Sequence, residues 1–209
     1  MSRITKIVPQ GKYKGRCKVY LEDGTSFSLH NDLLAKYGLR TGAEIDEEKI
    51  KEWLDEDETR HAYNAALRYL GFRSRTRKEL EDYLRQKGYG DRTVVNVIEK
   101  LKSYGLVDDK MFARDWVNNR KLTSPRSRMA MTFELLQKGV DREVIDEVVG
   151  SISDEDEEKQ AFKVAQKYYG RYRNLENRER ALKTGQALAR RGFSWEIIQR
   201  VIRKMDMEY

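Results

Sequence analysis

A short pattern that occurs three times constrains the fold of this chain more than any other feature. Its copies are LRQKGY, LLQKGV and LARRGF, and their glycines, Gly88, Gly139 and Gly192, lie 51 and 53 residues apart. In each copy, cations precede a glycine and an apolar residue follows it. This order is typical of a helix end in which Gly is left-handed and the next residue folds back on the helix, as in a Schellman motif. Recurrence of such an end predicts tandem helical units.

A new helix is expected after each glycine, because Asp91, Asp141 and Ser194 are good N-cap residues. An apolar stripe begins three residues after each cap, at identical offsets in the three copies. Its members are Val94, Val95 and Ile98 in the first copy, Val144, Ile145 and Val148 in the second, and Ile197, Ile198 and Val201 in the third. The shared offsets indicate a true repeat.

Two further helices are predicted before each glycine. Thr76 and Glu79 form a capping box at the start of one second helix. Ser124 is expected to cap the next, with Pro125 at its first position. In the third copy, acidic residues 154–158 suit the positive end of a helix. Each copy is therefore expected to be a three-helix unit of about 50 residues that packs on its neighbours.

The first 30 residues are predicted to form strands. Residues 16–21 and 26–29 alternate polar with apolar side chains, and Asp23 and Gly24 between them are typical of a hairpin turn. Residues 4–8 are expected to pair with these strands. A short helix over residues 32–37 should end at Gly38.

A helix over residues 45–54 is followed by the acidic run at residues 55–58, which we interpret as a boundary. The fold class predicted is mainly α, with three tandem three-helix repeats after a small β-containing N-terminal module. The predicted divisions are residues 1–55 for this module, 59–107 for repeat 1, 108–152 for repeat 2 and 153–209 for repeat 3.

Charge is distributed unevenly along the chain. Residues 1–58 hold 10 Lys and Arg against 12 Asp and Glu, whereas the remainder holds 32 against 23. A basic helical body favours a polyanionic partner, for which nucleic acid is the usual candidate. The alternative is a solvated surface laced with ion pairs.

Two basic clusters lie at the starts of predicted second helices. They are Arg73, Arg75, Arg77 and Lys78 in repeat 1, and Arg126 and Arg128 in repeat 2. Counted back from the repeat glycines, Arg75 matches Arg126 and Arg77 matches Arg128. Cations at a helix N-terminus oppose the macrodipole, so folding alone gives little reason for them and a partner that needs positive charge is indicated. The alternative is that these arginines are flexible side chains on exposed helices, which are common and need no partner.

Residues 167–173, KYYGRYR, interleave Lys167, Arg171 and Arg173 with tyrosines. Stacking on bases together with phosphate contact needs this combination. The alternative is that the tyrosines pack at the edge of a core.

Catalysis has little support in the sequence. His30 and His61 are the only histidines and neither has a partner at metal spacing. The chain contains no glycine-rich phosphate loop. The pair Asp108 and Asp109 is better explained if Asp109 caps a helix that begins at Lys110. We therefore expect no catalytic residue, cofactor or metal.

The sequence also predicts a cytoplasmic protein without a membrane segment. No apolar run reaches the roughly 20 residues that span a bilayer, and the N-terminus lacks the apolar stretch of a signal peptide. The single cysteine, Cys17, allows no internal disulfide. A monomer is the default expectation.

Several local patterns, in order, resemble the RecX family of RecA modulators. They are AALRYL at residues 65–70, RSRTRKEL at 73–80, LRQKG at 84–88, LVDDKMFARDWVNNR at 106–120 and ELLQKG at 134–139. The match covers about residues 60–150 closely and the rest more loosely. The N-terminal module resembles an extension found in some bacterial members.

The resemblance implies that the three repeats form an elongated, curved body. It implies binding in the groove of the RecA filament on single-stranded DNA, with contacts to RecA and to single-stranded or double-stranded DNA. It also implies modulation, usually inhibition, of RecA ATP hydrolysis, strand exchange and co-protease activity in recombination, DNA repair and the SOS response. Contact residues would come from the basic clusters.

Two alternatives remain open. One is an autonomous DNA-binding protein whose helical units contact duplex in a helix-turn-helix-like manner, with a steep dependence on salt and no need for a recombinase. The other, a nuclease or other enzyme, is disfavoured by the missing metal and acid–base groups.

Overall fold

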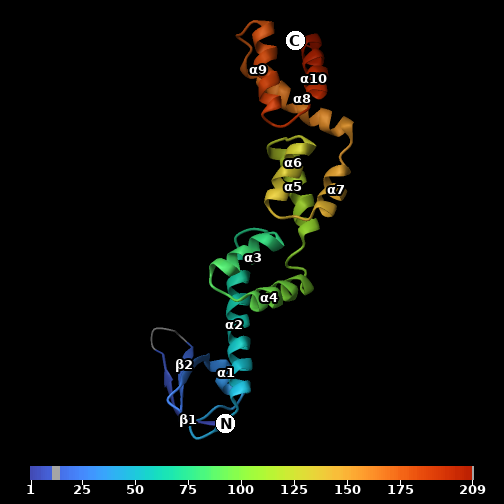
Figure 1. The fold of residues 1–209 in the computed structure, drawn as a ribbon. Helices are drawn as coiled ribbons and strands as arrows, with labels where there is room; N and C mark the ends of the chain where they lie inside the picture. The colour runs from blue at the N-terminus through green and yellow to red at the C-terminus, as the bar shows by residue number, and fades with distance from the viewer. Residues whose placement is uncertain (11–14, 209) are drawn as a thin grey trace. The chain divides into compact units, whose positions relative to one another are not determined.

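The computed structural model describes residues 1–10 and 15–208 (Figure 1). By its internal contacts the chain divides into two units, residues 1–73 with 81–103, and residues 74–80 with 104–209. In chain order the elements are β1 (Ser2–Pro9), β2 (Arg16–Leu21), β3 (Ser26–His30), α1 (Asn31–Lys36), β4 (Glu44–Ile45), α2 (Glu47–Leu70), α3 (Arg77–Gln86), α4 (Asp91–Ser103), α5 (Asp109–Thr123), α6 (Arg128–Gln137), α7 (Arg142–Gly150), α8 (Asp154–Arg171), α9 (Asn177–Ala189) and α10 (Trp195–Glu208).

The predicted fold class is confirmed as mainly α, with three three-helix repeats after a small strand module. The second half of α2 with α3 and α4 forms repeat 1, α5 to α7 form repeat 2, and α8 to α10 form repeat 3. The boundary between the two units falls inside α3, whose first turn belongs to the second unit.

The three glycine helix ends are confirmed in detail. Gly88, Gly139 and Gly192 have φ of 88°, 76° and 83°, in the left-handed region. In each copy the residue after the glycine donates its backbone N–H to the carbonyl five residues earlier, as in the bonds from Tyr89 to Leu84 and from Val140 to Leu135. This is the long hydrogen bond of a Schellman motif.

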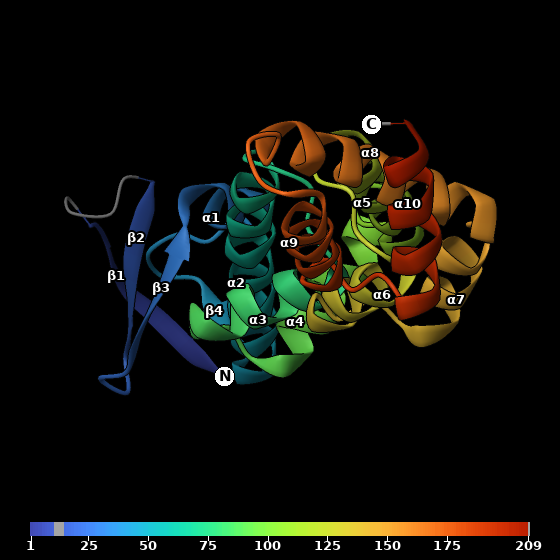
Figure 2. The same cartoon turned by 90° about the horizontal axis from the view of Figure 1, so that it is seen from above.

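The N-terminal module is an antiparallel sheet beside a helix. The strand order is β3-β2-β1-β4, and Figure 2 shows β1, β2 and β3 lying together on one side of α2. Its core contains Val19 and Leu29, both fully buried, and Trp53 from α2. The predicted strands, the turn at Gly24 and the short helix ending before Gly38 are all confirmed.

The helix predicted from Ile45 begins two residues later. Ile45 lies in β4 opposite Ser2, and is buried in the module's core. Asp46 caps α2 by accepting from the backbone N–H of Glu48. Of the apolar residues whose spacing predicted the helix, Ile45 lies in β4, and the others lie in the first turns of α2.

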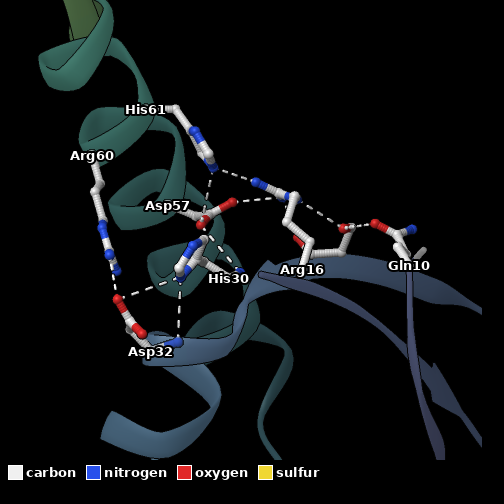
Figure 3. A network of polar contacts seen from close by, with 8 residues as sticks. Gln10, Arg16, His30, Asp32, Asp57, Arg60 and His61 are labelled. Atoms are coloured by element: carbon white, nitrogen blue, oxygen red, sulfur yellow. Dashed lines mark hydrogen bonds and ion pairs between the residues drawn. The ribbon is translucent and has the colours of Figure 1, made fainter. Parts of the chain in front are cut away.

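The acidic run does not interrupt the chain's helix, because α2 continues through it to Leu70. Asp57 is buried and its carboxylate lies 2.6 Å from the guanidinium of Arg16 on β2. Arg16 also donates to the carbonyl of Ser28 and contacts His61 Nε2 (Figure 3). The acidic run thus anchors the sheet to the helix that begins repeat 1.

The other acidic side chains of the run have partners on both sides of it. Glu56 pairs with Lys36 at 2.6 Å and accepts from the phenol of Tyr37. Glu58 accepts from the hydroxyl of Thr93 at 2.8 Å on α4. The run therefore joins the N-terminal module to α4 of repeat 1, and these two parts lie in the first unit.

Repeats 2 and 3 each have a core of their own. In repeat 2, Leu135 and Ile145 are fully buried with Phe112 packed against them. In repeat 3, the core includes Tyr169, Leu188 and Val201, all of which are buried. The apolar stripe of each third helix faces these cores.

Four local predictions are corrected. Ser124 is the C-cap of α5, and Ser127 caps α6 by accepting from Ala130 N–H, twelve residues before its repeat glycine, as Thr76 is before Gly88. The cap of α5 is Asp108, because its carboxylate accepts from Met111 N–H. The remaining differences are that Asp91 lies inside α4 and that Val95 is 56% exposed.

Candidate nucleic-acid and partner interface

In repeats 1 and 2, the second helix begins against the repeat that follows. Thr76 Oγ1 donates to the carbonyl of Lys138 at 2.7 Å, and Ser127 N–H donates to the carbonyl of Arg191 at 3.1 Å. Lys138 and Arg191 are the residues immediately before the glycines of repeats 2 and 3. The same junction is therefore used twice in the second unit.

The repeat glycines have a second role at these junctions. A Cβ on Gly139 would lie 2.2 Å from Lys78 Cδ, and one on Gly192 would lie 2.6 Å from Ser127 Oγ. A Cβ on Gly88 would meet no described atom within 4 Å. At position 88, glycine is therefore required only for the left-handed φ. At positions 139 and 192, the missing side chain also leaves room for the second helix of the preceding repeat to approach.

A carboxylate of the following repeat binds the start of each of these helices. Asp109 accepts from the backbone N–H of Arg77 at 2.8 Å, and Glu157 accepts from that of Arg128 at 2.9 Å. Carboxylates at a helix N-terminus complement its dipole and satisfy its free N–H groups.

Arg128 therefore has a reason in folding that the sequence did not reveal. Its Nε lies 2.6 Å from the buried carboxylate of Glu157, a second nitrogen donates to the carbonyl of Ile152 at 3.1 Å, and a third pairs with Asp154. The argument that folding gives little reason for cations here is wrong for Arg128. Arg77 also has an acidic partner in the next repeat, since its guanidinium lies 3.6 Å from Asp141.

The other predicted cations near these helix starts differ in exposure. Arg73 and Lys78 are exposed, and Arg75 is half-buried. The aliphatic part of Lys78 packs over Gly139. Arg126 lies 3.7 Å from Glu134 and donates to the carbonyl of Arg190 at 3.4 Å.

A basic cleft lies between repeats 2 and 3, within the second unit. It has a volume of about 290 Å³ and its cations come from three segments. They are Lys121 at the end of α5, Lys163 and Lys167 on α8, and Arg191 after α9. No carboxylate stands among the lining residues that the structure describes, and the rest of the wall is residues 122–125, Val164 and Tyr168.

Ion pairs do not account for the lysines of the basic cleft. None of Lys121, Lys163 and Lys167 forms an ion pair with a residue in the described ranges, 1–10 and 15–208. Lys163 and Lys167 are exposed and lie one helical turn apart on the same face of α8. A pocket of unpaired cations without carboxylates suits a phosphate group.

Tyr168 gives the basic cleft an aromatic wall. The guanidinium of Arg191 lies 5.3 Å from the centre of its ring and donates to its hydroxyl at 3.3 Å. This hydrogen bond is the main reason that the pKa of the Tyr168 phenol falls below its ordinary value. Proteins that bind single-stranded nucleic acid combine cations with aromatic rings in this way.

The predicted cluster at residues 167–173 is divided by the structure. Lys167 and Tyr168 line the basic cleft, whereas Arg171 and Arg173 are exposed and do not line it. Tyr169 is buried in the core of repeat 3 and donates to Asp206 at 2.6 Å, and burial raises its pKa. The alternative that these tyrosines pack in a core holds for Tyr169.

Lys121, Lys163 and Arg191 were missed because the cleft forms between repeats. The spacing of Lys163 and Lys167 was the one signal in the sequence, and it is shared by many solvated helix faces. Arg190 and Arg191 follow a predicted helix, where the dipole favours cations, so in the sequence they gave no separate signal of a site.

The described part of the chain also lacks two kinds of feature. No group of three or more His, Cys, Asp or Glu side chains is placed there to hold a metal ion. None of its helices combines the length and apolar character needed to cross a bilayer.

Four family models match the chain along most of its length. Models of the first, second and third three-helix domains of RecX match residues 62–101, 108–149 and 155–202, and a model of the regulatory protein RecX N-terminal domain matches residues 2–46. A regulatory protein RecX of Bacillus licheniformis is 34% identical over 208 residues, covering 100% of this chain and 79% of the relative. The chain belongs to the RecX family.

Other RecX proteins agree. A regulatory protein RecX of Clostridium perfringens strain SM101 is 31% identical, covering 98% of this chain and 97% of the relative. A crystal structure of regulatory protein RecX is similar with a TM-score of 0.69 at 29% identity, over 96% of this chain and 98% of that one. RecX from Lactobacillus salivarius has a TM-score of 0.65 at 31% identity, over 73% and 99%.

Proposed function

We propose that this RecX family chain regulates RecA by binding in the groove of the RecA filament on single-stranded DNA. It acts as a cytoplasmic monomer without catalysis of its own, and it lowers RecA ATP hydrolysis, strand exchange and co-protease activity. The observation that supports this most strongly is family membership over the full length, including the N-terminal module.

The basic cleft supports the DNA part of the proposal. In it, three unpaired lysines and Arg191 surround a half-buried tyrosine, so a phosphate and a neighbouring base could both be bound. Arg73, Arg75, Arg77, Lys78, Arg126, Arg128, Arg171 and Arg173 remain proposed as further contacts to RecA or DNA. Weak contacts spread over several repeats add by avidity on a repetitive lattice.

The experiment is RecA-catalysed ATP hydrolysis on single-stranded DNA, titrated with this chain at two salt concentrations. The proposal expects the rate to fall when the chain is substoichiometric to RecA. No change in rate, together with tight and salt-sensitive binding to naked duplex, would favour the autonomous DNA-binding protein instead.

Some of the proposed contact arginines also form ion pairs at the junctions between repeats, so their replacement can affect the fold as well as binding. Replacing Arg75, Arg77, Arg126 and Arg128 with alanine is expected to weaken inhibition, but Arg128→Ala also leaves the buried Glu157 without its ion pair. Arg126→Ala is the cleaner variant, because Glu134 keeps its partner Arg120 at 2.7 Å. Unchanged inhibition by both the quadruple variant and Arg126→Ala would remove these residues from the proposed interface.

A further inference from the structure

An apolar groove runs between α9 and α10 in repeat 3. It has a volume of about 540 Å³ and its lining is mainly aliphatic. At its floor the two helices come close, since a Cβ on Gly185 would lie 3.5 Å from Ile198 Cγ2. The other apolar residues that line it are Ala181, Leu182, Ala189, Trp195 and Ile202.

Two large side chains of the groove face solvent. Leu182 on α9 is 61% exposed and Trp195, the first residue of α10, is 69% exposed. Neither belongs to the core of repeat 3, which is formed by residues such as Tyr169, Leu188 and Val201. A contiguous exposed apolar surface on a folded domain is typical of an interaction site.

The charges of the groove have one sign. Arg178 and Arg203 line it, and no acidic residue does so within the described chain. Neither arginine forms an ion pair with a described residue, although neighbouring cations do. Lys183 pairs with Glu179, and both Arg200 and Lys204 pair with Glu158.

We infer that this groove docks an acidic amphipathic helix of a partner protein. The aliphatic floor fits bulky apolar side chains spaced at one face of a helix, and the two unpaired guanidiniums fit carboxylates on its flanks. Nucleic acid fits less well, because Trp195 is the single aromatic side chain of the lining and the floor offers aliphatic rather than stacking surface.

This site shares no lining residue with the basic cleft, and the inference does not rest on the proposed action on RecA. Its test therefore uses the full chain without RecA or DNA. The probe is a fluorescein-labelled synthetic peptide of about four helical turns, with Leu and Phe on one face and Glu on the flanks, followed by fluorescence anisotropy.

The expected result is saturable binding that Leu182→Glu weakens by at least about tenfold. Phe133→Glu is the matched control, because Phe133 is 60% exposed on α6 and lies outside the groove, and this variant should bind as the unchanged chain does. Helical circular dichroism should be the same for all three proteins, since both substituted side chains are exposed.

A charge exchange makes the test specific. The double variant Arg178→Glu/Arg203→Glu should lose the acidic peptide and bind a version in which Lys replaces Glu. Equal affinity of the acidic peptide for the unchanged chain and Leu182→Glu, or no binding to either, would overturn the inference. Displacement of the peptide by a single-stranded oligonucleotide that itself depends on Leu182 would also overturn it, in favour of nucleic acid.

Discussion

Removing the three lysines of the basic cleft should change DNA binding in a way that can be calculated. Lys121, Lys163 and Lys167 line the cleft without forming an ion pair in the described parts of the chain. If each neutralises one phosphate of single-stranded DNA, the slope of log affinity against log salt becomes less steep by about 0.7 for each lysine lost. The triple alanine variant should therefore lower the magnitude of the slope by about 2.

The assay is fluorescence anisotropy of a labelled single-stranded oligonucleotide over a series of salt concentrations. A rise in salt of about fourfold should weaken the unchanged chain about 20-fold more than the triple variant. The free energy of unfolding should change by about 1 kcal/mol or less, because only the helix dipole at the end of α5 loses a partner.

The control replaces Lys6, Lys49 and Lys51 with alanine, which removes the same charge from exposed positions of the N-terminal module. This variant should keep most of the original slope. If both triple variants lower the slope equally, general charge explains binding. If the cleft variant leaves the slope unchanged, the assignment of phosphate contacts to the basic cleft is refuted.

Three further predictions concern the stability of the fold. In urea titrations, Arg16→Met should lower the free energy of unfolding by about 3–5 kcal/mol, because it leaves the buried carboxylate of Asp57 without its Arg16 partner. The double variant Arg16→Met/Asp57→Leu should recover most of this loss, and a double variant no more stable than the single one would contradict the prediction. Burial, assisted by Arg16 and opposed by Asp57, lowers the pKa of His61 below 6.5, so the unfolded chain binds the proton more tightly and stability should fall as pH drops through 6.5 toward the folded-state pKa. In that pH range the urea midpoint of the His61→Gln variant should depend less on pH than that of the unchanged chain. An identical dependence would show that His61 is not the titrating group. In the same titration, Trp116→Ala should lower the free energy of unfolding by about 3 kcal/mol, because the partly buried ring stacks on Phe112 and its N–H donates to Glu134 at 2.8 Å. A loss below about 1 kcal/mol would show that these contacts contribute little to stability.

The repeat could be predicted from the sequence because its signals are local. A glycine that must be left-handed and an apolar stripe at fixed offsets depend only on neighbouring residues. All three glycine ends form as expected, and of the three stripes only the first has an exposed member, Val95. The position of Ser127 relative to Gly139 repeats that of Thr76 relative to Gly88. Pro125 favours a cap at Ser124, whereas the spacing of the repeat predicts the observed cap at Ser127.

The acidic run and the basic cleft could not be predicted in the same way. Asp57 is buried because Arg16, forty-one residues earlier, reaches it from the sheet, so the run resembles a linker in sequence and is a helix in the structure. Lys121, Lys167 and Arg191 meet only when repeats 2 and 3 pack together. Arg128 is similar, since the carboxylates that pair with it lie in the next repeat.

The affinity of this chain for RecA filaments, compared with that for naked DNA, tests the proposed function most directly. A labelled chain would be titrated with preformed RecA filaments on single-stranded DNA, with the same DNA alone, and with duplex of equal length, at one salt concentration. The proposal predicts the tightest binding to the filament. Equal or tighter binding to either naked DNA would contradict it and identify an autonomous DNA-binding protein.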